Sequence, residues 1–215
     1  MNEVTTLLTL ITVHVIALMS PGPDFALVVQ NAGRYGRQTG ILIALGLSLG
    51  ILLHSILSLT GASLIIQQQP TLFAIFQGAG GGYLLWLGIN AVKSVFQTAL
   101  SSTAESTQKT SQRVIANRKQ ALAKGFTTSI LNPKALVFFL SLLSTLVPVD
   151  MSITGKVTAI VMLWISSFLW FAILAWLLTG KKLQAKLLQW TPFIDGICGV
   201  LFATIGSMIL LNLII

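Results

Sequence analysis

The stretch Ser20-Pro21-Gly22-Pro23-Asp24 interrupts the first long apolar segment of the chain. Neither proline can donate a backbone hydrogen bond, so carbonyls one turn earlier lose their helical partners. When the helix restarts, Gly22 or Ser20 serves as its N-cap, Pro23 takes the first position and Asp24 lies in the first turn. In lipid, an unpaired carbonyl costs several kcal/mol unless protein, water or a ligand satisfies it. The stretch therefore predicts a broken helix that lines a cavity.

The composition predicts a membrane protein. The 215 residues are 54% hydrophobic and 8% charged, whereas soluble proteins average roughly 45–50% apolar and about 25% charged residues. The mean hydropathy is +0.88. Six apolar stretches are each long enough to cross a bilayer, at about 4–32, 40–66, 71–92, 122–147, 156–179 and 192–214. We expect an all-α protein with six transmembrane helices, which excludes a soluble enzyme, a nucleic-acid binder and a disordered tail.

The basic residues indicate topology. The net charge is +8, and eleven of the thirteen Lys and Arg residues follow the first, third and fifth apolar stretches. Positive residues gather in cytoplasmic connections, so both termini are expected outside the cell. The N-terminus carries Glu3 and no early basic residue, so we expect no signal peptide and a retained first segment. A re-entrant first segment, with the N-terminus inside, stays open because of the Pro-Gly-Pro break.

The two halves of the chain resemble each other. The segment 22–29 (GPDFALVV) matches 132–139 (NPKALVFF), and Gly81 and Gly88 have the same spacing as Gly199 and Gly206. A polar linker, 98–120, separates a first repeat, 1–97, from a second, 121–215. Because each repeat has three spans, an odd number, the copies must have opposite orientations. The sequence therefore predicts a 3+3 inverted repeat with broken helices one and four.

Asn132-Pro133-Lys134 repeats the helix-restart pattern in the fourth stretch. Two half-helix N-termini would then face the membrane interior from opposite sides, each favourable to a carboxylate. Asp24 and Lys134 are costly charges in this setting and need a partner or a wet cavity. They either form a structural ion pair or open to bind a zwitterion, with the ammonium at Asp24 and the carboxylate near Lys134. Alternatively, both motifs are proline kinks with a purely structural role in helix packing.

The remaining polar residues give weaker indications. His54 and Asp195 are candidates for a transport pathway, but a histidine here also fits hydrogen-bonded packing, as does His14, and Asp195 also fits a helix N-terminus. The single cysteine, Cys198, excludes a disulfide framework and a thiol metal site. The sequence has no nucleophile–base constellation and no metal-ligand spacing, so neither catalysis, a metal nor a cofactor is expected.

Three motifs resemble the lysine exporter/RhtB (LysE) superfamily: Met19-Ser20-Pro21-Gly22-Pro23-Asp24, Leu131-Asn132-Pro133-Lys134-Ala135 and the glycine-rich segment 80–88. Ile194-Asp195-Gly196 resembles the threonine and homoserine efflux branch. The resemblance implies a multi-pass exporter of small amino acids in the bacterial cytoplasmic (inner) membrane, driven by the proton gradient. Two intramembrane acids, one of them neutralised by Lys134, favour a neutral substrate. Export of basic or sulfur-containing amino acids or of a cation, a non-transporting scaffold, and assembly into a homo-oligomer stay open.

Overall fold

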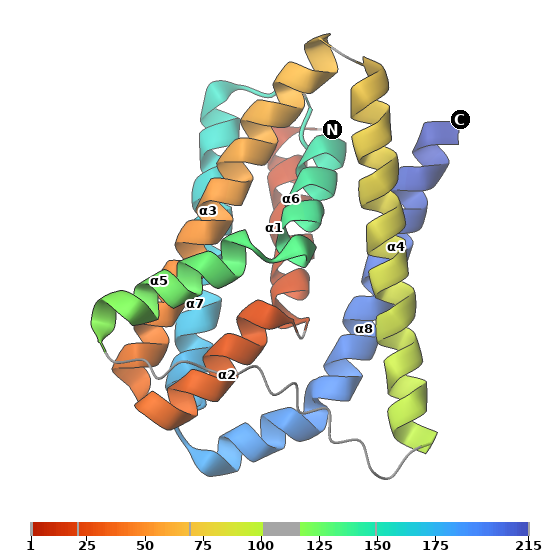
Figure 1. The fold of residues 1–215 in the computed structure, drawn as a ribbon. Helices are drawn as coiled ribbons and strands as arrows, with labels where there is room; N and C mark the ends of the chain where they lie inside the picture. The colour runs from red at the N-terminus through yellow and green to blue at the C-terminus, as the bar shows by residue number, and fades with distance from the viewer. Residues whose placement is uncertain (1, 21, 69, 101–116, 149, 215) are drawn as a thin grey trace.

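The computed structural model describes residues 2–20, 22–68, 70–100, 117–148 and 150–214, and every regular element within these ranges is an α-helix (Figure 1). The expected all-α fold is confirmed for this part of the chain. In chain order the helices are α1 (Glu3–Met19), α2 (Pro23–Tyr35), α3 (Arg37–Gln68), α4 (Pro70–Leu100), α5 (Arg118–Ile130), α6 (Pro133–Leu146), α7 (Ile153–Leu177) and α8 (Lys181–Ile214).

Two pairs of consecutive helices meet at a sharp bend. α1 and α2 differ in direction by 55°, and α5 and α6 by 57°. Gly22 is the N-cap of α2 and Asn132 that of α6, and a proline follows each cap at the first helical position. The proline has no N–H to continue the preceding helix but fits the start of a new one. The predicted broken helices therefore form, and Figure 1 shows both breaks near the middle of the molecule.

α3 is the central helix and packs against α2, α5, α6 and α7. Its approach to α5 is close because glycines face each other there. A Cβ atom added to Gly46 would lie 2.1 Å from the carbonyl oxygen of Leu122, and one added to Gly125 would lie 2.3 Å from that of Ile43. This contact holds α3, which follows the bent pair α1 and α2, against α5, which ends at the second break.

α4 and α8 form a second close pair at one side of the molecule (Figure 1). A Cβ atom at Gly206 would lie 2.6 Å from the oxygen of Gly81, and one at Gly88 would lie 2.5 Å from the oxygen of Gly199. Backbones that approach this closely leave no room for a side chain, which is the usual function of small residues between membrane helices.

Two helix boundaries differ from the sequence prediction. α8 begins at Lys181, well before the predicted segment 192–214, and contains Pro192. In Figure 1 its first part runs along the lower end before the helix turns upward, as expected where a proline removes a backbone hydrogen bond. α4 reaches Leu100 and α5 starts at Arg118, so each helix extends by three residues into the predicted linker 98–120. The rest of this linker lies outside the described residues.

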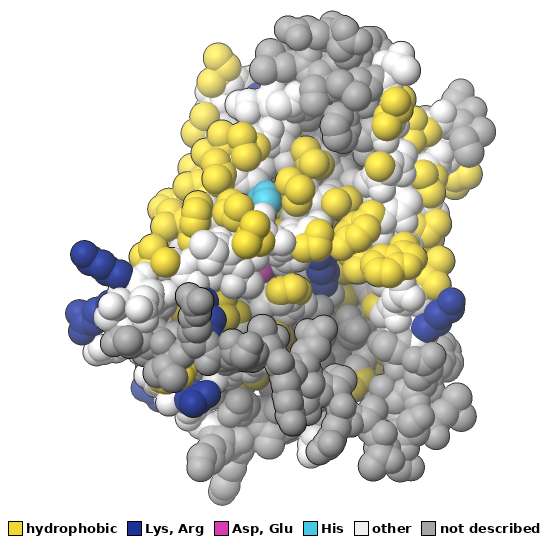
Figure 2. Space-filling model, in the orientation of Figure 1, with side chains coloured by type: hydrophobic (Ala, Val, Ile, Leu, Met, Phe, Trp, Pro, Cys, Tyr) yellow, Lys and Arg dark blue, Asp and Glu magenta, His cyan; other side chains and the backbone are white. Residues whose placement is uncertain are grey.

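The outer face of the protein is apolar. On α7, every fourth residue from Val157 to Ile173 is exposed and apolar, whereas Ala159, Leu163, Ser167 and Phe171 on the opposite face are buried. Figure 2 shows apolar side chains over much of the visible surface, with most exposed Lys and Arg in its lower half. Such a face is stable in contact with lipid. The corresponding face of a soluble protein would carry charged side chains.

Over the described residues, three helical stretches are long and apolar enough to cross a membrane: Arg37–Gly61, Ile153–Leu177 and Pro192–Leu211. Counting each bent pair as one span gives up to five. The remaining predicted segment, 71–92, falls within α4. The chain is thus an integral membrane protein.

Candidate functional site

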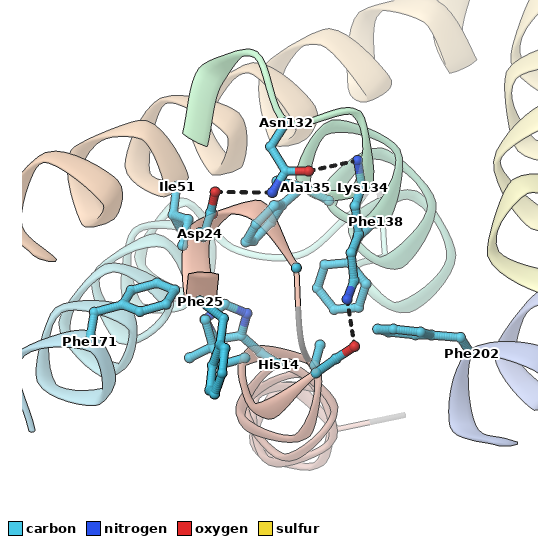
Figure 3. Close-up of a pocket in the computed structure, with 15 residues that line it drawn as sticks. His14, Asp24, Phe25, Ile51, Asn132, Lys134, Ala135, Phe138, Phe171 and Phe202 are labelled. Atoms are coloured by element: carbon cyan, nitrogen blue, oxygen red, sulfur yellow. Dashed lines mark hydrogen bonds between the residues drawn. The ribbon is translucent and has the colours of Figure 1, made fainter. Parts of the chain in front are cut away.

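The two helix breaks meet through Asn132. Its Nδ2 donates to Oδ1 of Asp24 at 3.0 Å, and its own Oδ1 accepts from the backbone N–H of Lys134, also at 3.0 Å. One amide therefore caps α6 and holds the carboxylate in the first turn of α2 (Figure 3). The sequence predicted the cap, but the bond to Asp24 joins residues 108 positions apart and only the fold reveals it.

Lys134 forms a second connection between the breaks. Its Nζ donates to Oγ of Ser20, the C-cap residue of α1, and lies 5.0 Å from the ring centroid of Phe202 on α8. A hydroxyl and an aromatic face both stabilise an ammonium group away from bulk water. The predicted partners Asp24 and Lys134 are thus brought to one place, where Asn132 holds the first and Ser20 the second.

A cavity of about 60 Å³ lies at this junction. Because one water molecule needs about 10–15 Å³ of such space, the cavity has room for roughly four to six water molecules. Asp24, Ser20 and Asn132 are buried at its edge, with 8%, 5% and 5% of their surface exposed. Its lining residues come from both breaks and from α3, α7 and α8: His14, Ala17, Leu18, Ser20, Gly22, Asp24, Phe25, Ile51, Asn132, Lys134, Ala135, Phe138, Phe139, Phe171 and Phe202 (Figure 3).

The cavity offers opposite charges within a mostly apolar lining. α2 and α6 begin beside it, so the partial positive charge of two helix N-termini adds to the ammonium of Lys134. The carboxylate of Asp24 supplies the negative side. Such an arrangement suits a small molecule that carries both charges, since each charge meets its opposite with little water to weaken the attraction.

A larger cavity, of about 370 Å³, adjoins the junction on the side of α4. It shares Ser20, Gly22, Asn132, Lys134 and Phe202 with the smaller one. The remaining lining residues are the prolines at the first positions of α2 and α6 and four residues of α4: Pro23, Pro133, Tyr83, Leu87, Asn90 and Ala91. Lys134 therefore stands between two cavities, one of which contains the carboxylate of Asp24.

Both membrane histidines are buried and hydrogen-bonded. Nε2 of His54 donates to the backbone oxygen of Ser129 at 3.0 Å, and Nε2 of His14 lies 2.9 Å from Oγ of Ser167. The ring of Phe139 stacks on His54 with 6.1 Å between centroids and an interplanar angle of 5°. The predicted packing contacts are present. His54, the predicted pathway residue, does not line the smaller cavity, whereas His14 does.

The structure brings most of the predicted site residues together. Ser20, Gly22, Asp24, Asn132 and Lys134 line the smaller cavity, and Pro23 and Pro133 line the larger one. Pro21 and the side chain of Asp195 lie outside the described residues. Sequence reasoning missed the aromatic wall. Phe138 follows Lys134 by one helical turn and could have been placed on the same face, but Phe171 and Phe202 come from distant helices without any local signal.

The chain is similar to known membrane proteins over nearly its whole length. The chain is 29% identical over 206 residues to the threonine efflux protein of Escherichia coli (strain K12), covering 95% of this chain and 97% of that protein. It is 27% identical over 206 residues to an uncharacterized membrane protein of Haemophilus influenzae, covering 96% of each. The leucine efflux protein of Enterobacter sp. (strain 638) is 30% identical over 138 residues, 64% of this chain and 62% of its own length.

No solved structure matches the chain significantly. The model of the LysE type translocator family matches residues 15–213. This range includes both helix breaks, every lining residue of the cavity between them except His14, and all of the α4–α8 pair except the last residue of α8. The resemblance predicted from the three motifs is confirmed, and the chain belongs to the LysE type translocator family.

Proposed function

We propose that this protein is a secondary active exporter of small neutral amino acids, of the threonine or homoserine type, coupled to the proton gradient. The observation that supports this proposal best is that Asp24 and Lys134 line one cavity at the junction of the two helix breaks. The substrate ammonium binds at Asp24, and its carboxylate binds near Lys134 and the first turns of α2 and α6.

The balance of charges at the cavity favours a neutral amino acid. Among the described lining residues, Asp24 is the one carboxylate and Lys134 the one lysine or arginine. A zwitterion leaves both matched, whereas a basic side chain would bring a second cation to an aromatic wall without a second carboxylate. The names of the threonine and leucine efflux relatives agree with a neutral substrate.

Proton coupling follows from competition for one carboxylate. The ammonium of the substrate and a proton from outside cannot both neutralise the single negative charge of Asp24. If each conformational change requires this charge to be neutralised, because a bare carboxylate is costly in the membrane, one proton enters for each amino acid that leaves. Export is then driven by the inward proton gradient without any bound cofactor.

An inverted repeat of three plus three helices is supported by the contacts between α4 and α8. Exchange of the repeats pairs Gly81 with Gly199 and Gly88 with Gly206. The contact of Gly206 with the oxygen of Gly81 then becomes that of Gly88 with the oxygen of Gly199, and the Cβ distances are 2.6 and 2.5 Å. A contact that maps onto itself in this way is the property of a two-fold interface.

Three further observations support the repeat and its orientation in the membrane. The two bends, 55° and 57°, occur at equivalent points of the two halves. α1 begins and α8 ends at the same end of the molecule, the upper end in Figure 1. Arg34 and Arg37 lie at the junction of α2 and α3, towards the other end. We therefore place the termini outside, the basic end in the cytoplasm, and the protein in the bacterial inner membrane with six spans.

Transport by purified protein in lipid vesicles tests the proposed function. Vesicles are loaded with radiolabelled threonine, and efflux is followed with and without a pH gradient that is acidic outside. We expect efflux that the gradient accelerates and that a protonophore slows. Faster efflux of lysine, cysteine or a metal ion than of threonine would reassign the substrate class. Absence of efflux of every one of these solutes from correctly oriented protein would refute an exporter and favour a scaffold.

A further inference from the structure

His14 is a buried polar residue of the cavity that the binding of a zwitterion leaves unused. It lies in α1 with 1% of its surface exposed, and its ring contacts those of Phe138 and Phe139 at centroid distances of 6.4 and 5.5 Å. In Figure 3 the imidazole reaches from α1 to the cavity beside Phe25. It is therefore within the enclosure that would surround the substrate side chain.

The hydrogen bonds of Ser167 decide which nitrogen of His14 carries the proton. Oγ of Ser167 lies 2.6 Å from the carbonyl oxygen of Leu163, which can only accept, so the single hydroxyl proton is used there. The contact of 2.9 Å between Ser167 and Nε2 of His14 is then a bond donated by the histidine. In the neutral ring Nδ1 is consequently a bare acceptor.

This acceptor has no use within the described part of the protein. Nδ1 of His14 is buried and has no hydrogen-bond partner among the described residues. A buried acceptor without a partner loses its hydration and receives nothing in return. The ring of His14 lines the cavity, while Nδ1 itself is covered by neighbouring atoms, so a ligand bound against this ring can supply the missing donor when the packing around Nδ1 opens.

We propose that Nδ1 of His14 accepts a hydrogen bond from the side-chain hydroxyl of the substrate, so that the cavity selects hydroxyl amino acids over apolar ones of the same shape. This inference rests on the proposed export of neutral amino acids, and it names His14 as the residue that recognises the side chain of the substrate. Asp24 meets the ammonium, while Lys134 and Ser20 meet the carboxylate. Phe25, Phe138 and Phe171 offer the side chain only carbon surface.

The selectivity arises from the unfilled acceptor. Threonine and valine have nearly the same shape, but valine leaves Nδ1 buried and unpaired whereas threonine satisfies it. A site built to bond a hydroxyl rejects the analogue that lacks one far more strongly than an apolar pocket rejects a methyl group. We expect the protein to prefer threonine over valine by about tenfold or more in kcat/KM.

The test compares threonine and valine efflux from the same vesicles for the wild-type protein and three variants. His14→Phe keeps a ring of similar size and removes the acceptor, so the preference should fall to within about twofold of unity. His14→Asn carries a carboxamide oxygen near the position of Nδ1 and should retain part of the preference. His54→Phe makes the same exchange at a buried histidine that does not line this cavity, and the ratio should not change.

The wild-type ratio alone can overturn the inference, even if a variant does not insert into the membrane. Equal, robust efflux of threonine and valine by the wild-type protein would overturn it and leave the proposed export intact. An unchanged preference in well-inserted His14→Phe protein would do the same. If the wild-type protein exports neither amino acid, the proposed function fails and this inference fails with it.

Discussion

Replacement of Asp24 by asparagine should abolish export while the protein still folds. Asparagine has nearly the same size, and its side-chain oxygen can still accept the 3.0 Å hydrogen bond from Nδ2 of Asn132. The junction of the two breaks therefore keeps its geometry. The substitution removes the negative charge that we propose as the partner of the substrate ammonium and of the coupling proton.

The size of the effect follows from the electrostatics of a buried pair. An ammonium about 4 Å from the carboxylate is attracted by about 4 kcal/mol at an effective dielectric constant of about 20, which is close to a thousandfold in affinity. Because the same charge is needed for coupling, the loss should appear in both KM and kcat. We expect threonine efflux in Asp24→Asn to fall by at least about a hundredfold.

The assay is threonine efflux from vesicles, normalised to the amount of correctly inserted protein. Asp150→Asn is the matched control, since Asp150 is exposed in the connection between α6 and α7 and touches neither cavity. It should export at the wild-type rate. Near-normal, gradient-driven efflux by Asp24→Asn would show that the charge is neither a ligand nor a coupling group, and the binding-site assignment would be wrong.

Three other substitutions test how the site is built. In the double variant Asp24→Lys with Lys134→Asp, a cation would face the amide donor of Asn132 and an anion would replace the donor to Ser20, so the protein should insert without exporting; restored threonine efflux would indicate a plain ion pair. Asn132→Ala leaves Oδ1 of Asp24 and the backbone N–H of Lys134 without this partner, so the free energy of unfolding in detergent should fall by about 1–3 kcal/mol. Asn117→Ala, at the exposed cap of α5, should cost less, and equal melting temperatures of the two variants would contradict this prediction. Gly206→Ala places a Cβ atom 2.5 Å from the backbone nitrogen of Leu85 and should cost about 1–3 kcal/mol, whereas Gly82→Ala meets nothing within 4 Å; comparable thermal shifts would refute close α4–α8 packing.

The sequence was most informative where it departs from an ordinary membrane helix. Prolines and charges are costly in lipid, so Pro23, Asp24, Pro133 and Lys134 could be identified from composition and position alone. The helix restart after each proline then placed the N-caps, and the structure confirms Gly22 and Asn132 in those positions. Local chemistry was sufficient for these residues because the constraint acts within one helical turn.

Residues that obey the rules of a membrane helix gave no such signal. Phe171 and Phe202 are ordinary apolar residues of α7 and α8, and only the packing of those helices brings them to the cavity. Asn132 was predicted as a cap, but its second bond, to Asp24, depends on the approach of two breaks that are far apart in the sequence. The start of α8 at Lys181 was missed because hydropathy marks the apolar part of a helix and not its polar beginning.

His14 shows why hydrogen-bond direction adds what neither sequence nor position supplies. From the sequence it was a packing histidine, and its contact with Ser167 agrees with that interpretation. The same contact, once the proton of Ser167 is assigned to Leu163, leaves the other ring nitrogen as an acceptor beside the cavity. A residue can thus be structural through one atom and selective through another. In an exporter whose charged groups recognise features common to all amino acids, discrimination must come from such a neutral contact to the side chain.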